Sequence, residues 1–347
     1  MGKHAAAADA QHPTEVTLER VAEALRGLGF ASVQRDDAPD RLVVAALSFT
    51  AAVWIDYRQP MALVVDTAER IPTDFEHATA LARFINTWNH DRVGPAASYR
   101  LAESGDFTVR MRRPIHIKHG LTDEQLGAEL VDTLAHAASF STKLRTRFLD
   151  AALDHLLPPQ LVRLQDAEVL NGRHPSLRHL PRGGREDIVS APELFAPLDA
   201  ALRPVAPETL AGVLDSLDFR YAMNESGIIA TGVNGVPFAL TVDGDSDETY
   251  ARVTGMWDTG LDADEEFLRL WLVCNDVNER ATGAAAYLHE FDGRLHLHAE
   301  ATMLATAGAA AEQVEEFTVS SMAACLASID YVSQLVSGRS AVEWPNT

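Results

Sequence analysis

The chain has little cysteine and no long apolar run. Cys274 and Cys325 are its only two thiols, lie far apart and fit neither a CxxC motif nor a zinc-ligand spacing. We therefore expect reduced thiols and a cytoplasmic protein. No stretch of 18 apolar residues is present, so no segment is predicted to span a membrane. The Ala-rich segment 1–13 lacks the apolar run of a secretory signal and is predicted to be a disordered tail.

Positive charge is also scarce. The 347 residues include 29 Lys and Arg against 50 Asp and Glu, a formal net charge of −21 at pH 7. Because nucleic-acid binding depends on clustered Lys and Arg, no nucleic-acid partner is expected. Hydrophobic residues make up 47% of the chain, an ordinary globular composition. At this length we expect two domains, each with its own core.

The motifs of common catalytic sites are missing. The sequence holds no GxSxG, no HExxH, no GxxxxGK[ST] and no GxGxxG. His116 and His119 flank Lys118 outside any such pattern, and we interpret them as loop surface. The chain is therefore predicted not to be an enzyme, and no catalytic residue, metal or cofactor is assigned to it.

What the sequence does contain is an internal repeat. Helix-like stretches of the two halves align at an offset of 189 residues, pairing Val21 with Leu210, Leu25 with Leu214, Leu28 with Leu217 and Phe30 with Phe219. The same offset pairs Phe49 with Phe238, Val53 with Val242, Val64 with Val253, and Asn86-Thr-Trp-Asn89 with Asn275-Asp-Val-Asn278. We place the loss of one residue near His90, after which an offset of 188 pairs Arg92 with Arg280, Tyr99 with Tyr287, Gly105 with Gly293, and Glu124-Gln125 with Glu312-Gln313. One register over more than 100 residues indicates a duplicated module.

Hydrophobic periodicity predicts the same order of elements in both halves. In the first half, apolar spacing predicts helices at residues 15–28, 74–88 and 122–149. Runs rich in Val and Ile predict strands at residues 42–47, 51–57, 61–66, 97–102 and 107–111. Gly105 is expected in the turn of the last hairpin, and Thr122 with Gln125 is expected to form a capping box. The long last helix has its twin at residues 309–336.

These elements predict an α+β fold. Each module has the order α-β-β-β-α-β-β-α, with a mostly antiparallel sheet covered by helices. The predicted layout is a disordered tail at 1–13, a first module at 14–150, a linker with a helix and a basic Pro- and Gly-rich loop at 151–206, a diverged second module at 207–338 and a tail at 339–347. The linker is long enough for the modules to pair as an intramolecular pseudo-dimer.

In the first module, Asn86-Thr-Trp-Asn89 at a helix end is followed by a hairpin and then by Leu121-Thr-Asp-Glu-Gln-Leu126 before a long helix. With these features the module resembles the YbjN family, in a tandem actinobacterial version. The second copy keeps Asn275, Asn278, Tyr287 and Glu312-Gln313. The resemblance implies a fold similar to the type III secretion chaperones, small dimeric proteins that hold extended client peptides. It also implies a binding protein with a role in sensing or regulation.

The paired asparagines have two interpretations. Because Asn tolerates the left-handed conformation that ends helices, Asn86, Asn89, Asn275 and Asn278 are interpreted first as helix caps. Alternatively, their amides bind the backbone of a partner's peptide strand, with Trp88 at the rim of the binding groove. The remaining aromatic candidates are predicted core residues: Trp54, Tyr57, Trp257 and Trp271.

A basic island lies in the linker, formed by Arg173, His174, Arg178, His179, Arg182 and Arg185. It is either a solvated loop or a contact site for an acidic partner. The acidic run from Asp243 to Glu248 is interpreted as a solvated hairpin tip, because it lacks the Gly and Glu of a calcium loop.

His296, His298 and Glu300 alternate along a strand and so share one face, as metal ligands must. No ligand beyond these is evident, and we interpret them as an exposed strand face.

The function that these observations favour is binding of a protein or peptide client by a non-catalytic, chaperone-like or regulatory protein. Self-association between modules or between chains is compatible with it. The alternative is a dedicated scaffold or regulator that docks one folded partner, with the second module purely structural. An unrecognised hydrolase or metal enzyme, with a deep polar pocket or a bound ion, is the third interpretation.

Overall fold

The computed structural model describes residues 12–35, 38–46, 48–58, 60–148, 201–244, 248–280 and 283–345. Most of the predicted tail at 1–13 and most of the linker, including the basic island from Arg173 to Arg185, lie outside the described residues. The predictions made for those segments therefore stay predictions.

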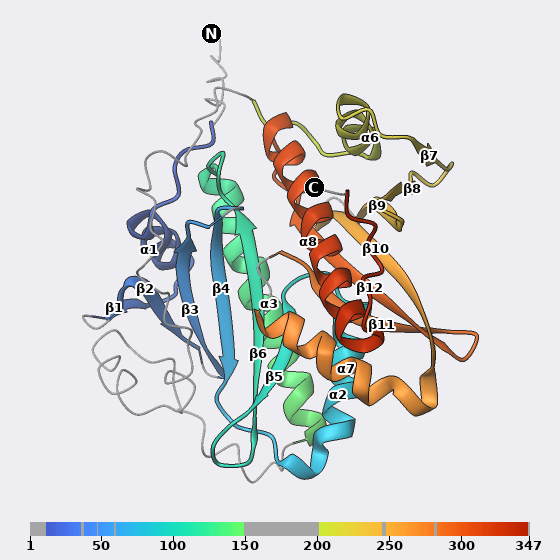
Figure 1. The fold of residues 1–347 in the computed structure, drawn as a ribbon. Coiled ribbons are helices and arrows are strands. Elements are labelled where there is room, and N and C mark those ends of the chain that lie inside the picture. The colour runs from blue at the N-terminus through green and yellow to red at the C-terminus, as the bar shows by residue number, and fades with distance from the viewer. Residues whose placement is uncertain are drawn as a thin grey trace.

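The first module is a six-stranded antiparallel sheet with helices packed on it (Figure 1). Its helices are α1 (Leu18–Gly27), the short 3-10 helix η1 (Phe75–His77), α2 (Ala78–Asp91) and α3 (Asp123–Phe148). Its strands are β1 (Ser32–Arg35), β2 (Ala38–Ala45), β3 (Phe49–Asp56), β4 (Ala62–Glu69), β5 (Ala96–Leu101) and β6 (Phe107–His116). They lie in the order β1-β2-β3-β4-β6-β5.

The second module repeats this topology. Its helices are α6 (Pro207–Ser216), α7 (Ala263–Arg280) and α8 (Ala311–Ser337). Its strands are β7 (Tyr221–Met223), β8 (Ile229–Val233), β9 (Val236–Gly244), β10 (Thr249–Asp262), β11 (Ala285–Phe291) and β12 (Arg294–Leu304), in the order β11-β12-β10-β9-β8-β7. The predicted α+β fold and its duplication are confirmed.

Each module has one strand more than the sequence pattern predicted. The additional strands, β1 and β7, pair with β2 and β8 at the outer edge of each sheet. They span only 4 and 3 residues, and none of the side chains described in them is buried, so they show none of the alternation that marks a half-buried strand.

The residue missing from the second copy lies in a hairpin turn, not near His90. Ala97 on β5 faces Met111 on β6, and Ala286 on β11 faces Ala299 on β12. The offset is therefore still 189 at β5 and becomes 188 only at β6, after the turn. The loss shortens the loop between the two strands and leaves the helix before it unchanged.

Several predicted residue pairs change with the observed registers, and one of them is Val64 with Val253, because Val65 now corresponds to Val253. Tyr99 corresponds to Leu288 rather than to Tyr287. Val53 corresponds to Leu240 rather than to Val242, because equivalent rows of paired apolar residues cross the two sheets. The row in the first sheet is Leu42, Val53 and Val65, and the row in the second is Ile229, Leu240 and Val253. Hairpin loops of unequal length shift the register without disturbing the core.

Local signals account for the helices and turns that were predicted correctly. Thr17 caps α1 by accepting a hydrogen bond from the Arg20 N–H at 3.3 Å. Thr122 and Gln125 form the expected capping box of α3, with bonds of 2.9 and 3.1 Å. Gly105 has a φ of +91°, the left-handed backbone that the hairpin turn requires.

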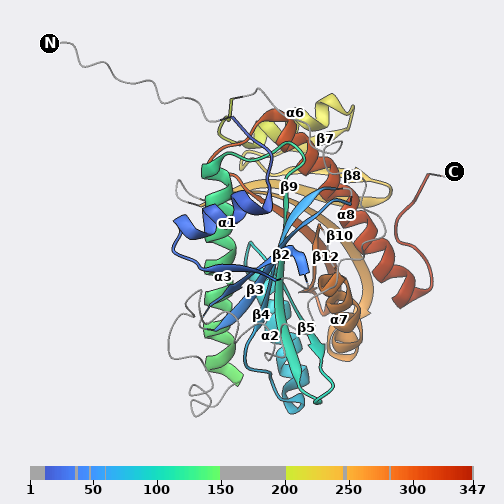
Figure 2. The same ribbon diagram turned by 90° about the vertical axis from the view of Figure 1, so that its left-hand side faces the viewer.

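The two long helices cover the sheets from opposite sides. Figure 2 shows α3 and α8 beginning near each other and diverging along the two sides of the molecule, with the strands between them. By length and composition alone, α8 is the one described helix that could cross a membrane. Phe317, Cys325 and Ile329 are fully buried on it, as expected of a core helix packed on β10 and β12.

Residues after α8 also pack against the second module. Val342 is 5% exposed, and the Glu343 N–H donates to the main-chain oxygen of Asn234 at 2.7 Å. Part of the segment predicted as a tail, at Val342 and Glu343, thus packs on the second module, with Glu343 bonded to the turn between β8 and β9.

Candidate functional site

A reciprocal pair of asparagines joins the two modules. Asn86 on α2 donates from Nδ2 to the main-chain oxygen of Leu288 at 2.9 Å and accepts from the Leu288 N–H at 2.7 Å. Asn275 on α7 makes the same two bonds with Tyr99, at 2.8 and 2.9 Å. Each side-chain amide therefore takes the place of a neighbouring strand at the β5 or β11 edge of the other module's sheet. The pattern makes the chain an intramolecular pseudo-dimer.

Asn89 and Asn278 close the same edges from within their own modules. Asn89 exchanges two hydrogen bonds with Ala97 of β5, at 2.9 and 2.8 Å. Asn278 does so with Ala286 of β11, at 2.8 and 2.6 Å. The helices continue to Asp91 and Arg280, so the helix-cap interpretation was wrong. The backbone groups that an added peptide strand would need here are paired inside the chain.

A second reciprocal contact lies at the start of the long helices. Gln125 donates from Nε2 to the main-chain oxygen of Gly308 at 2.9 Å, and Gln313 donates to that of Gly120 at 2.8 Å. The two side chains also bond each other, at 3.1 and 3.3 Å. Gln125 and Gln313 thus each cap their own helix by accepting a hydrogen bond at Oε1, and each bonds the other module by donating from Nε2. These bonds fix α3 and α8 relative to each other.

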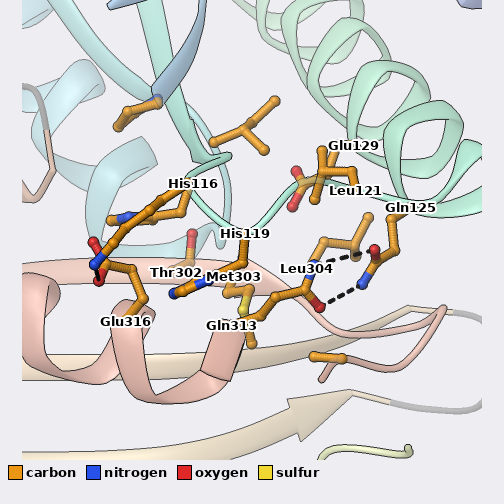
Figure 3. Close-up of a pocket in the computed structure, with 14 residues that line it drawn as sticks. His116, His119, Leu121, Gln125, Glu129, Thr302, Met303, Leu304, Gln313 and Glu316 are labelled. Carbon is orange, nitrogen blue, oxygen red and sulfur yellow. Dashed lines mark hydrogen bonds and ion pairs between the residues drawn. The ribbon is translucent and has the colours of Figure 1, made fainter. Parts of the chain in front are cut away.

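A small cavity beside these glutamines is enclosed by both modules. Figure 3 shows His116, Glu129, Leu304 and Glu316 around it, with the Gln125–Gln313 pair at one side. Its volume is about 40 Å³, which is room for a few water molecules. It is too small for a metabolite or a peptide side chain, so we look for the binding site elsewhere.

A buried charge network lies next to this cavity. The Arg113 guanidinium bonds Asp132 Oδ2 at 2.7 Å and lies 2.9 Å from Glu129 Oε2. All three side chains are at most 7% exposed. Burial raises the pKa of Glu129 against the opposing charge of Arg113. Asp132 also accepts from the Tyr250 hydroxyl at 2.5 Å, so the network ties α3 to the second sheet.

An open groove is the larger hollow at the junction. It has a volume of about 430 Å³ and lies where α2 and α3 meet the start of β10 and the end of β12. Its lining combines an apolar wall with a polar end, and its main members are Trp88, Arg92, Val131, Asp132, His136, Glu248 and Leu304. Because both modules contribute residues, the groove exists only in the paired arrangement. We call it the junction groove.

A family model describes both halves of the chain. The YbjN model, with the description "Putative bacterial sensory transduction regulator", matches residues 17–145 and again residues 206–334. The chain belongs to the YbjN family. The family description names a regulator and not an enzyme, which supports a regulatory or binding role.

A solved structure carries the same family name. It is titled "Crystal structure of YbjN, a putative transcription regulator from E. coli" and is 15% identical to this chain. The match covers 42% of this chain and 100% of that one, with a TM-score of 0.34. Among curated proteins no match was found.

Several side chains of the YbjN modules differ from their sequence-based interpretation. His116 is the last residue of β6 rather than loop surface, and it packs against Phe317 of α8 with its Nδ1 3.4 Å from Ser320 Oγ. Glu300 is 6% exposed and is paired with Arg252 and Tyr287, so it is not part of an exposed strand face. Sequence spacing could not indicate these contacts, because each depends on a distant segment.

Histidines from both YbjN modules meet on the second sheet. His90 of α2 lies parallel to His289, with Nε2 and Nδ1 2.9 Å apart, and His289 lies beside His298. Burial lowers the pKa of His298 to about 4, with the neighbouring histidines adding to the shift. Only one proton can lie between the facing ring nitrogens of His90 and His289.

The remaining candidates are placed as follows. Trp88 is 5% exposed and contacts Phe140 edge to face, while its ring lines the junction groove. Trp271 is fully buried. Cys274 and Cys325 are free and buried, and burial raises the pKa of Cys325 to about 12. Of the acidic run, the ends at Asp243 and Glu248 are described, and Glu248 faces the groove.

His116 predicts an acid-dependent loss of stability. Burial lowers its pKa to about 4, against about 6.5 in an unfolded chain, so the unfolded state binds the extra proton. The stabilisation is fully present above pH 6.5 and is lost as the pH falls toward 4, by about 2 to 3 kcal/mol. His116→Asn keeps a polar partner for Ser320 and should flatten this slope in urea unfolding at several pH values. His77→Asn, at the surface, should leave it unchanged; equal slopes for His116→Asn and the unmodified chain would contradict the assignment.

Proposed function

We propose that this YbjN protein is a regulator that acts by binding a protein or peptide partner in the junction groove. The observation that carries the proposal is the groove itself, an open hollow of about 430 Å³ whose apolar wall and polar end come from both modules. Hollows of this kind accept the buried anchor of a partner. Recognition by strand addition is not proposed at β5 or β11, because the asparagines occupy both edges.

The groove favours a partner with a large apolar anchor. Trp88 and Leu304 offer apolar surface, and Val131 is 44% exposed at the rim. Arg92 and Glu248 supply polar groups around them. A buried anchor surrounded by a polar rim is the usual arrangement of a binding hot spot. The net charge of −21 favours approach of basic partners and disfavours nucleic acid. We place the protein in the cytoplasm, where its two buried thiols stay reduced.

The second module is more than a structural support in this proposal. Glu248, Leu304 and Thr306 belong to it and form one side of the groove. This favours a client-binding regulator over the alternative in which only the first module docks a partner. A dedicated scaffold remains an outcome of the test below.

Val131 provides the test, because its pseudo-symmetric twin is a matched control. Val131 on α3 corresponds to Val319 on α8, and the two are 44% and 43% exposed. A charge at Val131 would have to be desolvated beneath a bound anchor. We therefore expect Val131→Glu to reduce partner capture from lysate of the native host about tenfold or more, and Val319→Glu to leave it unchanged. Mass spectrometry of the retained proteins gives the measurement.

The identity of the retained proteins separates the two binding modes. Several unrelated polypeptides bound through unstructured segments would support a chaperone-like regulator, whereas one stoichiometric folded partner would support a scaffold. Equal capture by the Val131→Glu and Val319→Glu chains would show that the junction groove is not the binding surface. Circular dichroism of each variant checks that both remain folded.

A further inference from the structure

We propose that Asp132, His136 and Glu248 bind a first-row divalent transition-metal ion at the polar end of the junction groove. The inference goes beyond partner binding and does not depend on it. Asp132 and His136 lie one helical turn apart on α3 of the first module, and Glu248 precedes β10 of the second. A bound ion would therefore link the two modules across their junction.

The three side chains converge in space. One ligand atom from each lies within 4.8 Å of the others. His136 Nδ1 is 3.0 Å from the main-chain oxygen of Asp132 and 3.2 Å from Asp132 Oδ1, which orients the imidazole. Metal-oxygen and metal-nitrogen bonds of about 2.0 to 2.2 Å require only small side-chain movements from this arrangement. The exposed end of Glu248 supplies the movable ligand.

Asp132 and Glu248 share one hydroxyl proton as a hydrogen-bond donor. The Tyr250 hydroxyl lies 2.5 Å from Asp132 Oδ1 and 3.1 Å from Glu248 Oε1, but its single proton can serve only one of them. Arg113 is shared between Glu129 and Asp132, so the cluster holds more carboxylates than guanidinium groups. A divalent cation at this point would add positive charge to an acidic cluster.

The other half of the molecule packs its equivalent helix without these side chains. Asp132 corresponds to Ser320 and His136 to Ala324 in the equivalent positions of α8. The correspondence is structural: a Cβ at Gly94 would meet the His136 ring at 3.3 Å, and one at Gly283 would meet the Ala324 Cβ at 2.8 Å. The same helix packing is thus built with and without the ligand set, which points to a role other than packing.

The donor set selects the class of ion. Two carboxylates and one imidazole suit zinc and its first-row neighbours, whereas Ca²⁺ takes six to eight oxygen ligands. Arg113 and Tyr250 both donate to Asp132, as outer partners commonly orient a metal ligand. The junction groove beside the three residues leaves room for water or a partner's group at the open coordination position of the ion. We choose Zn²⁺ as the probe.

The test is a zinc titration of the intact chain after treatment with a chelator. Competition with a chromogenic zinc indicator should show one Zn²⁺ per chain that excess Mg²⁺ does not displace. Glu248→Gln and His136→Ala should each weaken binding about tenfold or more. Glu248→Gln changes an exposed residue with little change in size, so it tests the site even if His136→Ala folds poorly.

The control variant lies in the histidine group on the second sheet. His289→Asn should bind zinc as tightly as the unmodified chain, because His289 is not part of the proposed ligand set. Binding that persists in both groove variants, binding that is lost in His289→Asn, or the absence of stoichiometric zinc would overturn the proposal. The titration uses the purified chain alone, so its outcome is independent of whether Val131→Glu abolishes partner capture.

Discussion

Replacing Asn86 or Asn275 by alanine is expected to loosen the junction between the modules and to lower the free energy of unfolding by about 2 to 5 kcal/mol each. Each substitution removes two hydrogen bonds to one buried residue of the other module, Leu288 or Tyr99. Both residues are at most 6% exposed, so water does not replace the lost partner. The cost is that of leaving one N–H and one C=O buried and unpaired.

The matched controls are the asparagines that bond within a module. Asn89→Ala and Asn278→Ala remove the same number of hydrogen bonds from Ala97 and Ala286. They should lower stability by a similar amount without separating the modules. Hydrogen exchange distinguishes the two cases: Asn86→Ala should expose the Leu288 amide, and Asn89→Ala the Ala97 amide.

The isosteric change Asn86→Asp sharpens the test. A carboxylate oxygen still accepts from the Leu288 N–H, but the second oxygen then faces the Leu288 carbonyl instead of donating to it. We expect a loss as large as that of alanine, because two acceptors face each other in a buried position. An Asn86→Asp chain as stable as the unmodified one would show that the donated bond contributes little.

Removal of Arg113 is expected to cost about 3 to 5 kcal/mol of stability, measured by urea unfolding in the presence of a metal chelator. Arg113→Met keeps the bulk of the side chain and leaves Glu129 and Asp132 as two buried carboxylates without their cation. Breaking one partner of a buried ion pair costs more than the pair itself contributes, because the remaining charge stays desolvated.

Two further variants define the cause. Adding Glu129→Gln to Arg113→Met removes one of the two stranded charges and should restore part of the lost stability. Arg58→Met removes a guanidinium that is 72% exposed from its pair with Asp56 and should cost less than about 1 kcal/mol. If Arg113→Met were as mild as Arg58→Met, the network around Asp132 would be structurally dispensable.

The asparagine motif also explains how the sheets avoid unwanted pairing. An open sheet edge is a template for association with other chains. In this protein the inner edges β5 and β11 are covered by side-chain amides from α2 and α7, two from each helix. The outer edges, β1 and β7, are limited to 4 and 3 residues, which leaves little length for strand addition. Because the module is duplicated, each copy provides an asparagine that bonds the edge strand of the other copy's sheet.

The sequence by itself determined the features that depend on neighbouring residues. The three long helices of the first module, its hairpins, the capping box at Thr122 and the repeat follow from periodicity and turn chemistry, which act over a few residues. The same patterns missed β1 and β7, because short strands without a buried face carry no period. They also placed the one-residue loss near His90, whereas the strand registers place it in the hairpin loop between β11 and β12.

Only the tertiary structure decided what the chemically active side chains do. Asn86 bonds a residue 202 positions away, and Tyr250 reaches Asp132 from 118 positions away. No spacing rule links such residues, since the pairing of two modules brings them together. The sequence therefore indicated that asparagines, histidines and carboxylates were present. Burial, charge balance and the meeting of α3 with β10 decided which of them hold the modules together and which line the junction groove.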